Sequence, residues 1–94
     1  MYIIPKSRTA KERVAATMPA IAARDNFLRR LAGADRDTIV VMMVEAIDMH
    51  LAANGLDPVG GDGRAVVSVE EICASHCLRA AREAFALRIA EAAG

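Results

Sequence analysis

The sequence is poor in the residues that usually stabilise a small secreted or β-rich domain. Its 94 residues include no Trp, one Tyr and two Phe, and its two cysteines are too few for a disulfide framework. Strict alternation of apolar and polar residues, which marks a half-buried strand, is nearly absent. These gaps argue against a disulfide-stabilised fold and against a β-sheet protein.

An excess of one charge and a long apolar run are both missing. Twelve basic residues balance twelve acidic ones, which argues against a dedicated nucleic-acid-binding protein. Glu45, Asp48 and His50 interrupt the main apolar stretch well before the ~20 apolar residues of a membrane span. The N-terminus, MYIIPKSRTAKER, places its short apolar run before its charges, which is not the order of a secretory signal. We therefore expect a cytoplasmic protein with no membrane partner.

What is present is an apolar fraction of 54%, supplied mainly by Ala, Val, Met and Leu. Helix-forming residues dominate this composition. A chain of this length forms one domain and buries only about 60–65% of its unfolded surface, so its own core is marginal. We predict an all-α fold, a small bundle of three to four helices that dimerisation completes. Residues 1–8 are expected to be a flexible N-terminal segment, and residues 9–94 a single helical domain.

Capping residues and helix breakers predict where the first helical segment lies. The helical pattern starts at Thr9 and stops at Gly33. Within it, Pro19 removes a backbone donor, and Thr17 is suited to cap a helix that follows. We therefore expect a break near residues 17–19, with a single kinked helix as the alternative.

The same signals predict the remaining boundaries. Asp35 or Asp37 can cap the second helix, and the Asn-Gly pair at residues 54–55 is a common helix stop because Gly accepts the left-handed conformation. A glycine-rich connector follows. The last helix opens with SVEE, in which Ser68 and Glu71 match a capping box.

The second helix is apolar over most of its circumference. Only Asp37, Thr38, Glu45 and Asp48 make its narrow polar strip. A helix of this kind belongs in a buried position, and the two other helical segments are too few to cover it. A second copy that packs its matching helix alongside closes the gap, and two-fold dimers are the commonest oligomers. The predicted dimer interface consists of Ile39, Met42, Met43, Ile47 and Leu51.

A docking groove for another protein is the alternative use of the same helix. Methionine side chains adapt to varied partners, and Met42, Met43 and Met49 are spaced along it. The simpler interpretation of these methionines is that they fill the core.

Positive and negative charges are separated along the chain. Residues 1–36 contain eight basic and three acidic residues, whereas residues 37–94 contain four arginines and nine acids. A basic N-terminal arm of this kind seeks an anionic partner, or remains a solvated tail. The predicted partner-binding residues are Lys6, Arg8, Lys11, Arg13, Arg29 and Arg30.

Cys73, His76 and Cys77 are close in sequence, and His50 offers a fourth ligand, so a metal site is an alternative use of these residues. Structural zinc sites usually take pairs of ligands from different elements, and His76 falls on the polar side of its helix. The cysteines are more simply small core residues. We predict no metal site and no cofactor.

The sequence contains no recognisable nucleophile–base–acid spacing, no paired carboxylates and no nucleotide-binding fingerprint, so support for catalysis is weak. We therefore predict a small non-enzymatic regulatory or interaction protein that binds another macromolecule, mainly a protein. Such a protein would be an inhibitor, an adaptor or an antitoxin-like partner.

The alternative function is a DNA-binding transcriptional regulator that uses the basic N-terminal segment. The stretch SVEEICASHCLRAAREAF has the opening rhythm of a helix-turn-helix. It departs from that motif at Cys77, where the turn prefers Gly, and at Glu83, where a buried apolar residue belongs. The stretch therefore reads more naturally as one unbroken helix.

Overall fold

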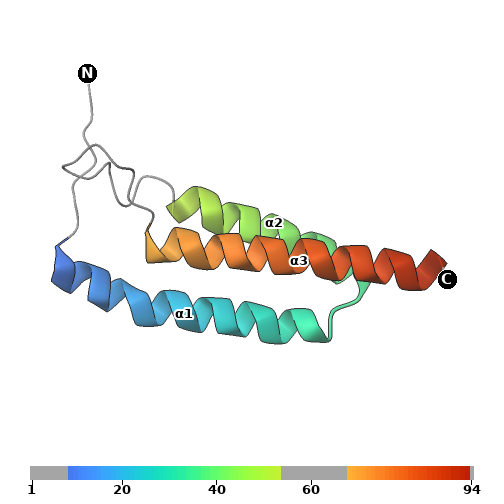
Figure 1. The fold of residues 1–94 in the computed structure, drawn as a ribbon, viewed down its shortest axis with the longest axis horizontal. Helices are drawn as coiled ribbons and strands as arrows, with labels where there is room; N and C mark the ends of the chain where they lie inside the picture. The colour runs from blue at the N-terminus through green and yellow to red at the C-terminus, as the bar shows by residue number, and fades with distance from the viewer. Residues whose placement is uncertain (1–8, 54–67, 94) are drawn as a thin grey trace, which may run out of the picture.

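The computed structural model describes residues 9–53 and 68–93, which form three α-helices. These are α1 (Ala10–Ala32), α2 (Arg36–Ala53) and α3 (Val69–Ala93) (Figure 1). The prediction of a small all-α bundle is confirmed, with three helices. Residues 1–8, predicted to be a flexible segment, lie outside the described residues. No helix within the described ranges is both long and apolar enough to cross a membrane.

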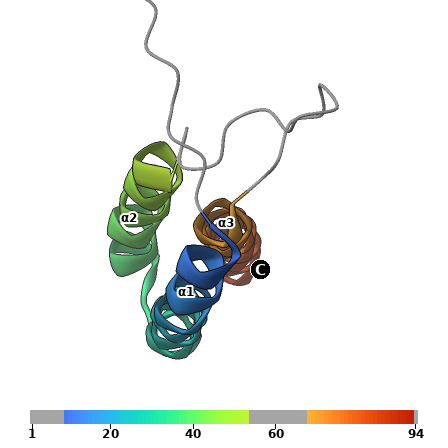
Figure 2. The same cartoon turned by 90° about the vertical axis from the view of Figure 1, so that its left-hand side faces the viewer.

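The helix α3 occupies the middle of the bundle. It packs along both α1 and α2, whereas α1 and α2 barely touch each other. Adjacent helices along the chain run in opposite directions, and the C-terminal turns of α3 extend past the other two helices (Figure 1). An end-on view shows α2 beside α3, with no helix on the far side of α2 (Figure 2). The bundle is therefore open around α2.

The core lies where α1 and α2 meet α3. Phe27 and Leu31 come from α1, and Ile39 and Met42 come from α2. On α3 the matching positions are small, and Cys77 is fully buried among them. Small side chains let helix axes approach closely, which explains how two helices bury their larger residues against one.

Side-chain caps set the three helix starts. The Thr9 Oγ1 accepts a hydrogen bond of 3.2 Å from the amide of Glu12 and so caps α1. At the start of α2, Asp35 Oδ1 accepts a 2.8 Å hydrogen bond from the Thr38 amide. Hydrogen bonds from the Thr38 hydroxyl and amide hold the pKa of Asp35 below its ordinary value. Of the two predicted caps for α2, Asp35 is therefore the one used.

At the start of α3, Ser68 caps the helix as predicted, but the Glu71 side chain, the second member of the predicted capping box, points to α2. Ser68 is buried, and its Oγ accepts a 3.1 Å hydrogen bond from the Glu71 amide. The Glu71 carboxylate lies 3.7 Å from the Nε2 atom of His50 on α2. Glu71 therefore links α3 to α2.

The predicted break at residues 17–19 is wrong, because α1 continues through Pro19. Pro19 and Ala15 both lie on the exposed side of the helix, so the carbonyl that loses its donor faces water. On the opposite side, Ala20 and Phe27 are buried. The residues that follow the proline anchor the helix to the core, and Thr9 provides the cap that was assigned to Thr17.

Candidate functional site

Four apolar residues on α2 form a continuous exposed line. Val40, Val44, Ile47 and Leu51 follow one another at intervals of four, three and four residues, which places them on one side of the helix. Their exposed fractions are 45%, 53%, 44% and 64%. We call these four residues the α2 stripe. Val41, which is also exposed, lies beside it.

The fold turns the α2 stripe outward because another face of α2 is already in use. Ile39, Met42, Ala46 and Ala53 are buried, and Ile39, Met42 and Ala46 belong to the core that α2 shares with α1 and α3. In the end-on view, the side of α2 away from α3 is bordered by no other helix (Figure 2). The rotation of α2 is therefore set by its buried face, and the α2 stripe is what remains.

Polar contacts on both sides of α2 support this rotation. On one side, the Nδ1 atom of His50 lies 3.3 Å from the Ser75 hydroxyl, and its Nε2 atom lies 3.7 Å from Glu71. On the side that faces α1, Arg30 donates two hydrogen bonds, of 3.2 and 3.3 Å, to the carboxylate of Glu45. The apolar line between these contacts contains no charged residue.

The structure divides the predicted dimer-interface residues into two groups. Ile39 and Met42 are fully buried within the chain itself, and Met43 is half-buried against the core. Ile47 and Leu51 lie in the α2 stripe and are exposed. Val40 and Val44 were not among the predicted interface residues, although their spacing to Ile47 and Leu51 is visible in the sequence. A helix that is apolar nearly all round gives no sign of which side meets the core.

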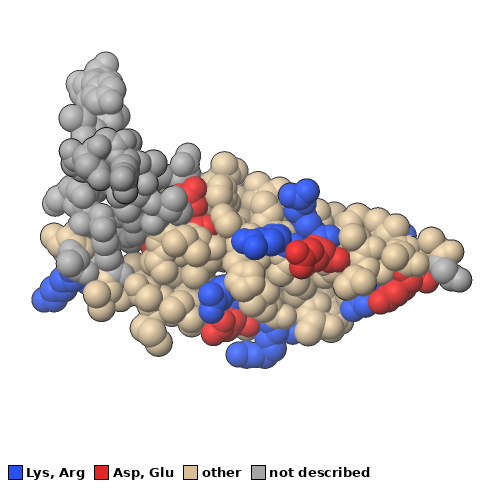
Figure 3. All heavy atoms as spheres, viewed as in Figure 1, with Lys and Arg blue, Asp and Glu red and all other residues tan. Residues whose placement is uncertain are grey.

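The predicted partner-binding residues are spread over the N-terminal part of the chain. Lys6 and Arg8 lie outside the described residues, and Arg13 lies within α1. The side chains of Lys11 and Arg29 are exposed on α1, whereas Arg30 is held by Glu45. On the face shown in Figure 3, basic and acidic side chains lie next to one another among uncharged residues. The side chains of three of these six residues are therefore described by the structure, and one of the three, Arg30, forms an ion pair with α2.

The two cysteines face the interior. Cys73 and Cys77 are buried, whereas His76 is exposed and His50 contacts Ser75. The pKa of the Cys77 thiol is raised mainly by burial and to a lesser extent by the nearby Cys73. Across the two described ranges, no three His, Cys, Asp or Glu side chains are grouped as metal ligands. Cys73 and Cys77 thus pack as small core residues, and burial disfavours ionisation of the Cys77 thiol.

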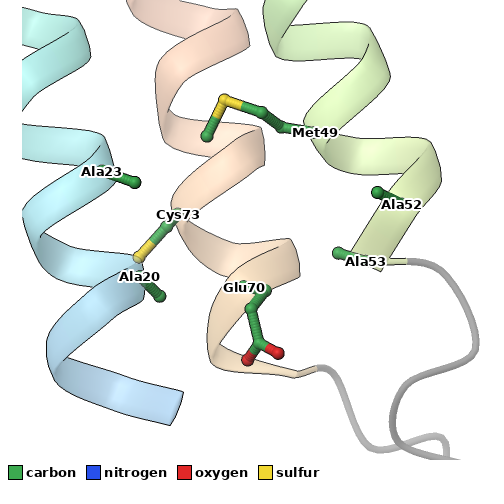
Figure 4. Close-up of a pocket in the computed structure, with 7 residues that line it drawn as sticks. All are labelled: Ala20, Ala23, Met49, Ala52, Ala53, Glu70 and Cys73. Carbon is green, nitrogen blue, oxygen red and sulfur yellow. The ribbon is translucent and has the colours of Figure 1, made fainter.

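An apolar groove of about 250 Å³ lies between α1 and α2, with α3 at its floor (Figure 4). Most of its lining residues are small, and the Cys73 side chain points toward α1 (Figure 4). Glu70 is the charged residue among them. The groove offers shape and apolar surface, and its lining contains no nucleophile paired with a base. Its lining residues are Ala20, Ala23, Met49, Ala52, Ala53, Glu70 and Cys73.

Comparisons with known proteins leave the chain without a family assignment. It matches no protein-family model, no curated protein and no solved structure. Function is therefore inferred from the chemistry of the surfaces, of which the α2 stripe is the most distinctive.

Proposed function

We propose that the protein acts without catalysis, by binding another macromolecule through the α2 stripe. The observation that supports this most is the exposure of Val44 and Ile47 at the centre of a four-residue apolar line. Exposed apolar residues scattered singly are ordinary, but a contiguous patch marks a place where another surface docks. With Val41, the patch exposes apolar area on the order of 400 Å², within the range at which such patches are often functional.

The polar groups of the described helices support binding more than chemistry. His50, Glu71 and Ser75 hold α2 against α3, and Arg30 and Glu45 join α1 to α2. Each of these contacts serves the assembly of the bundle. A regulator, an inhibitor or an adaptor needs this kind of rigid support beneath a docking surface.

The helix-turn-helix alternative gains no support from the fold. A helix-turn-helix motif needs a turn near Cys77, but α3 is helical without interruption from Val69 to Ala93. DNA binding would then depend on the basic N-terminal residues alone, and it would weaken steeply as salt rises.

Photo-crosslinking in the native host tests the proposal directly. A benzoylphenylalanine placed at position 44 is expected to give a covalent adduct with whatever covers the α2 stripe. The matched control is position 14, because Val14 is also an exposed valine but lies on α1. Equal adduct yields at positions 44 and 14, or none at either, would contradict the proposal. The mass of the adduct identifies the occupant.

A further inference from the structure

We propose that the occupant of the α2 stripe is a second copy of this chain, packed antiparallel about a two-fold axis that passes between Val44 and Ile47. This inference rests on the proposed function, since it names the partner of the same surface. It goes further because it specifies which residues meet and in which direction the helices run.

The spacing of the stripe is the first reason. Intervals of four, three and four residues read the same from either end, so the stripe is unchanged when the helix direction is reversed. A two-fold dimer requires a patch that is complementary to itself in this sense. The antiparallel arrangement brings Val40 opposite Leu51 of the second copy, and Val44 opposite its Ile47.

Side-chain size is the second reason. Each antiparallel layer joins a valine to a larger residue, so all four layers have similar volume. Facing positions that alternate small and large side chains pack without gaps. A parallel pair would instead join Val40 and Val44 to their own copies at one end, and Ile47 and Leu51 to theirs at the other. The gap between the helices would then widen along the axis.

Electrostatics favours the same direction. In the antiparallel pair, the N-terminus of each α2 lies beside the C-terminus of the other, so the helix dipoles attract. Asp37 lies one turn before Val40, past the end of the stripe, and Asp48 is the exposed acid that lies alongside it. In the antiparallel pair, Asp48 lies near Val41 of the second copy. It is displaced along the helix axis from Asp48 of that copy. No like charges are forced together in the apolar line.

The area of the patch determines how tightly the copies bind. About 400 Å² per copy gives about 800 Å² in total, and even with half-buried neighbours such as Met43 and His50 the interface only approaches the ~1,200 Å² at which stable interfaces begin. We therefore expect a dimer that dissociates on dilution through the micromolar range.

Complementary charges test both the partner and the direction. Val44→Glu and Ile47→Lys each place a charge in the stripe, so either variant alone is expected to sediment as a single chain. When the two variants are mixed, antiparallel pairing brings Glu opposite Lys and restores a two-chain species. A parallel dimer would not bring these positions together and would not be restored. Val14→Glu, on α1, is the control and should retain the wild-type mass.

Circular dichroism shows whether each variant keeps its helices. If the charged variants lose helicity, Val44→Cys mixed with Ile47→Cys replaces them, and the mixed disulfide should form in preference to either homodisulfide. The native Cys73 and Cys77 are buried and leave this readout clear. A wild-type chain that stays single at all micromolar concentrations would overturn the inference. In that case an adduct at position 44 with a different protein would leave the proposed function standing. A wild-type dimer whose variants fail to complement each other would overturn the antiparallel register.

Discussion

The guanidinium of Arg30 and the carboxylate of Glu45 meet side by side, with two hydrogen bonds of 3.2 and 3.3 Å joining α1 to α2. The two helices otherwise barely touch, so this pair crosses the open side of the bundle. It also occupies an arginine that the sequence assigned to partner binding. The contact limits how far α2 can rotate and so helps to keep the α2 stripe outward.

The Arg30–Glu45 pair is expected to contribute little to global stability. Its side chains are 49% and 40% exposed, so solvent screens the attraction. We predict a coupling of about 0.2–1 kcal/mol from a double-mutant cycle of Arg30→Gln and Glu45→Gln, measured by urea unfolding. A coupling several times larger would mean that the pair is far less hydrated than its exposure indicates.

The cap at Ser68 is expected to contribute more, because it is buried at the start of the central helix. Ser68→Ala removes the acceptor of the Glu71 amide and should lower the free energy of unfolding by about 1–2 kcal/mol. Thr9→Ala, at the exposed start of α1, is the control and should cost less. Equal losses in thermal or urea unfolding would contradict the central place of α3 in the fold.

The Cys77 thiol is expected to make the protein less stable at alkaline pH. Burial raises its pKa in the folded state, so above the ordinary value of 9.0 the unfolded chain ionises first. Stability is therefore fully present below about pH 9 and falls as the pH rises toward the higher pKa of the folded state. Urea unfolding at several pH values should show this slope. Cys77→Ala should reduce it while lowering stability at neutral pH.

The fold class follows from the sequence because local signals agree with the packing. Composition predicts helices, and Asp35 and Ser68 mark two of the three starts by their own hydrogen-bonding chemistry. Pro19 led to the wrong prediction of a helix break, because α1 is held by packing against α3, which is a tertiary effect that the local sequence does not show. Arg30 and Glu45 are distant in sequence, so no local pattern predicts their contact.

The candidate site was predicted in part. The sequence shows that the second helix is apolar over most of its circumference, and Ile47 and Leu51 lie on its exposed side, where the proposed interface requires them. Ile39 differs from Val40 only in its position around the helix, and both are aliphatic. Only the packing of α2 on α3 separates the residues that the chain buries itself from those that it leaves exposed.

The basic N-terminal residues are expected to bind anions without contributing to the fold. Replacement of four of them by Gln should lower the salt concentration that elutes the protein from immobilised heparin, an anionic polymer, while thermal stability changes little. Arg79→Gln with Arg82→Gln, on the exposed side of α3, is the control. Elution at the same salt as wild type would mean that the segment is only a solvated tail. The four residues are Lys6, Arg8, Lys11 and Arg13.

Sedimentation velocity of the wild-type chain across micromolar concentrations tests most directly whether a second copy covers the α2 stripe. We predict that the weight-average mass rises with concentration from one chain toward two. The double variant Val44→Glu with Ile47→Glu should remain a single helical chain over the same range. A wild-type chain that sediments as one chain at every concentration, indistinguishable from the double variant, would contradict the proposed dimer.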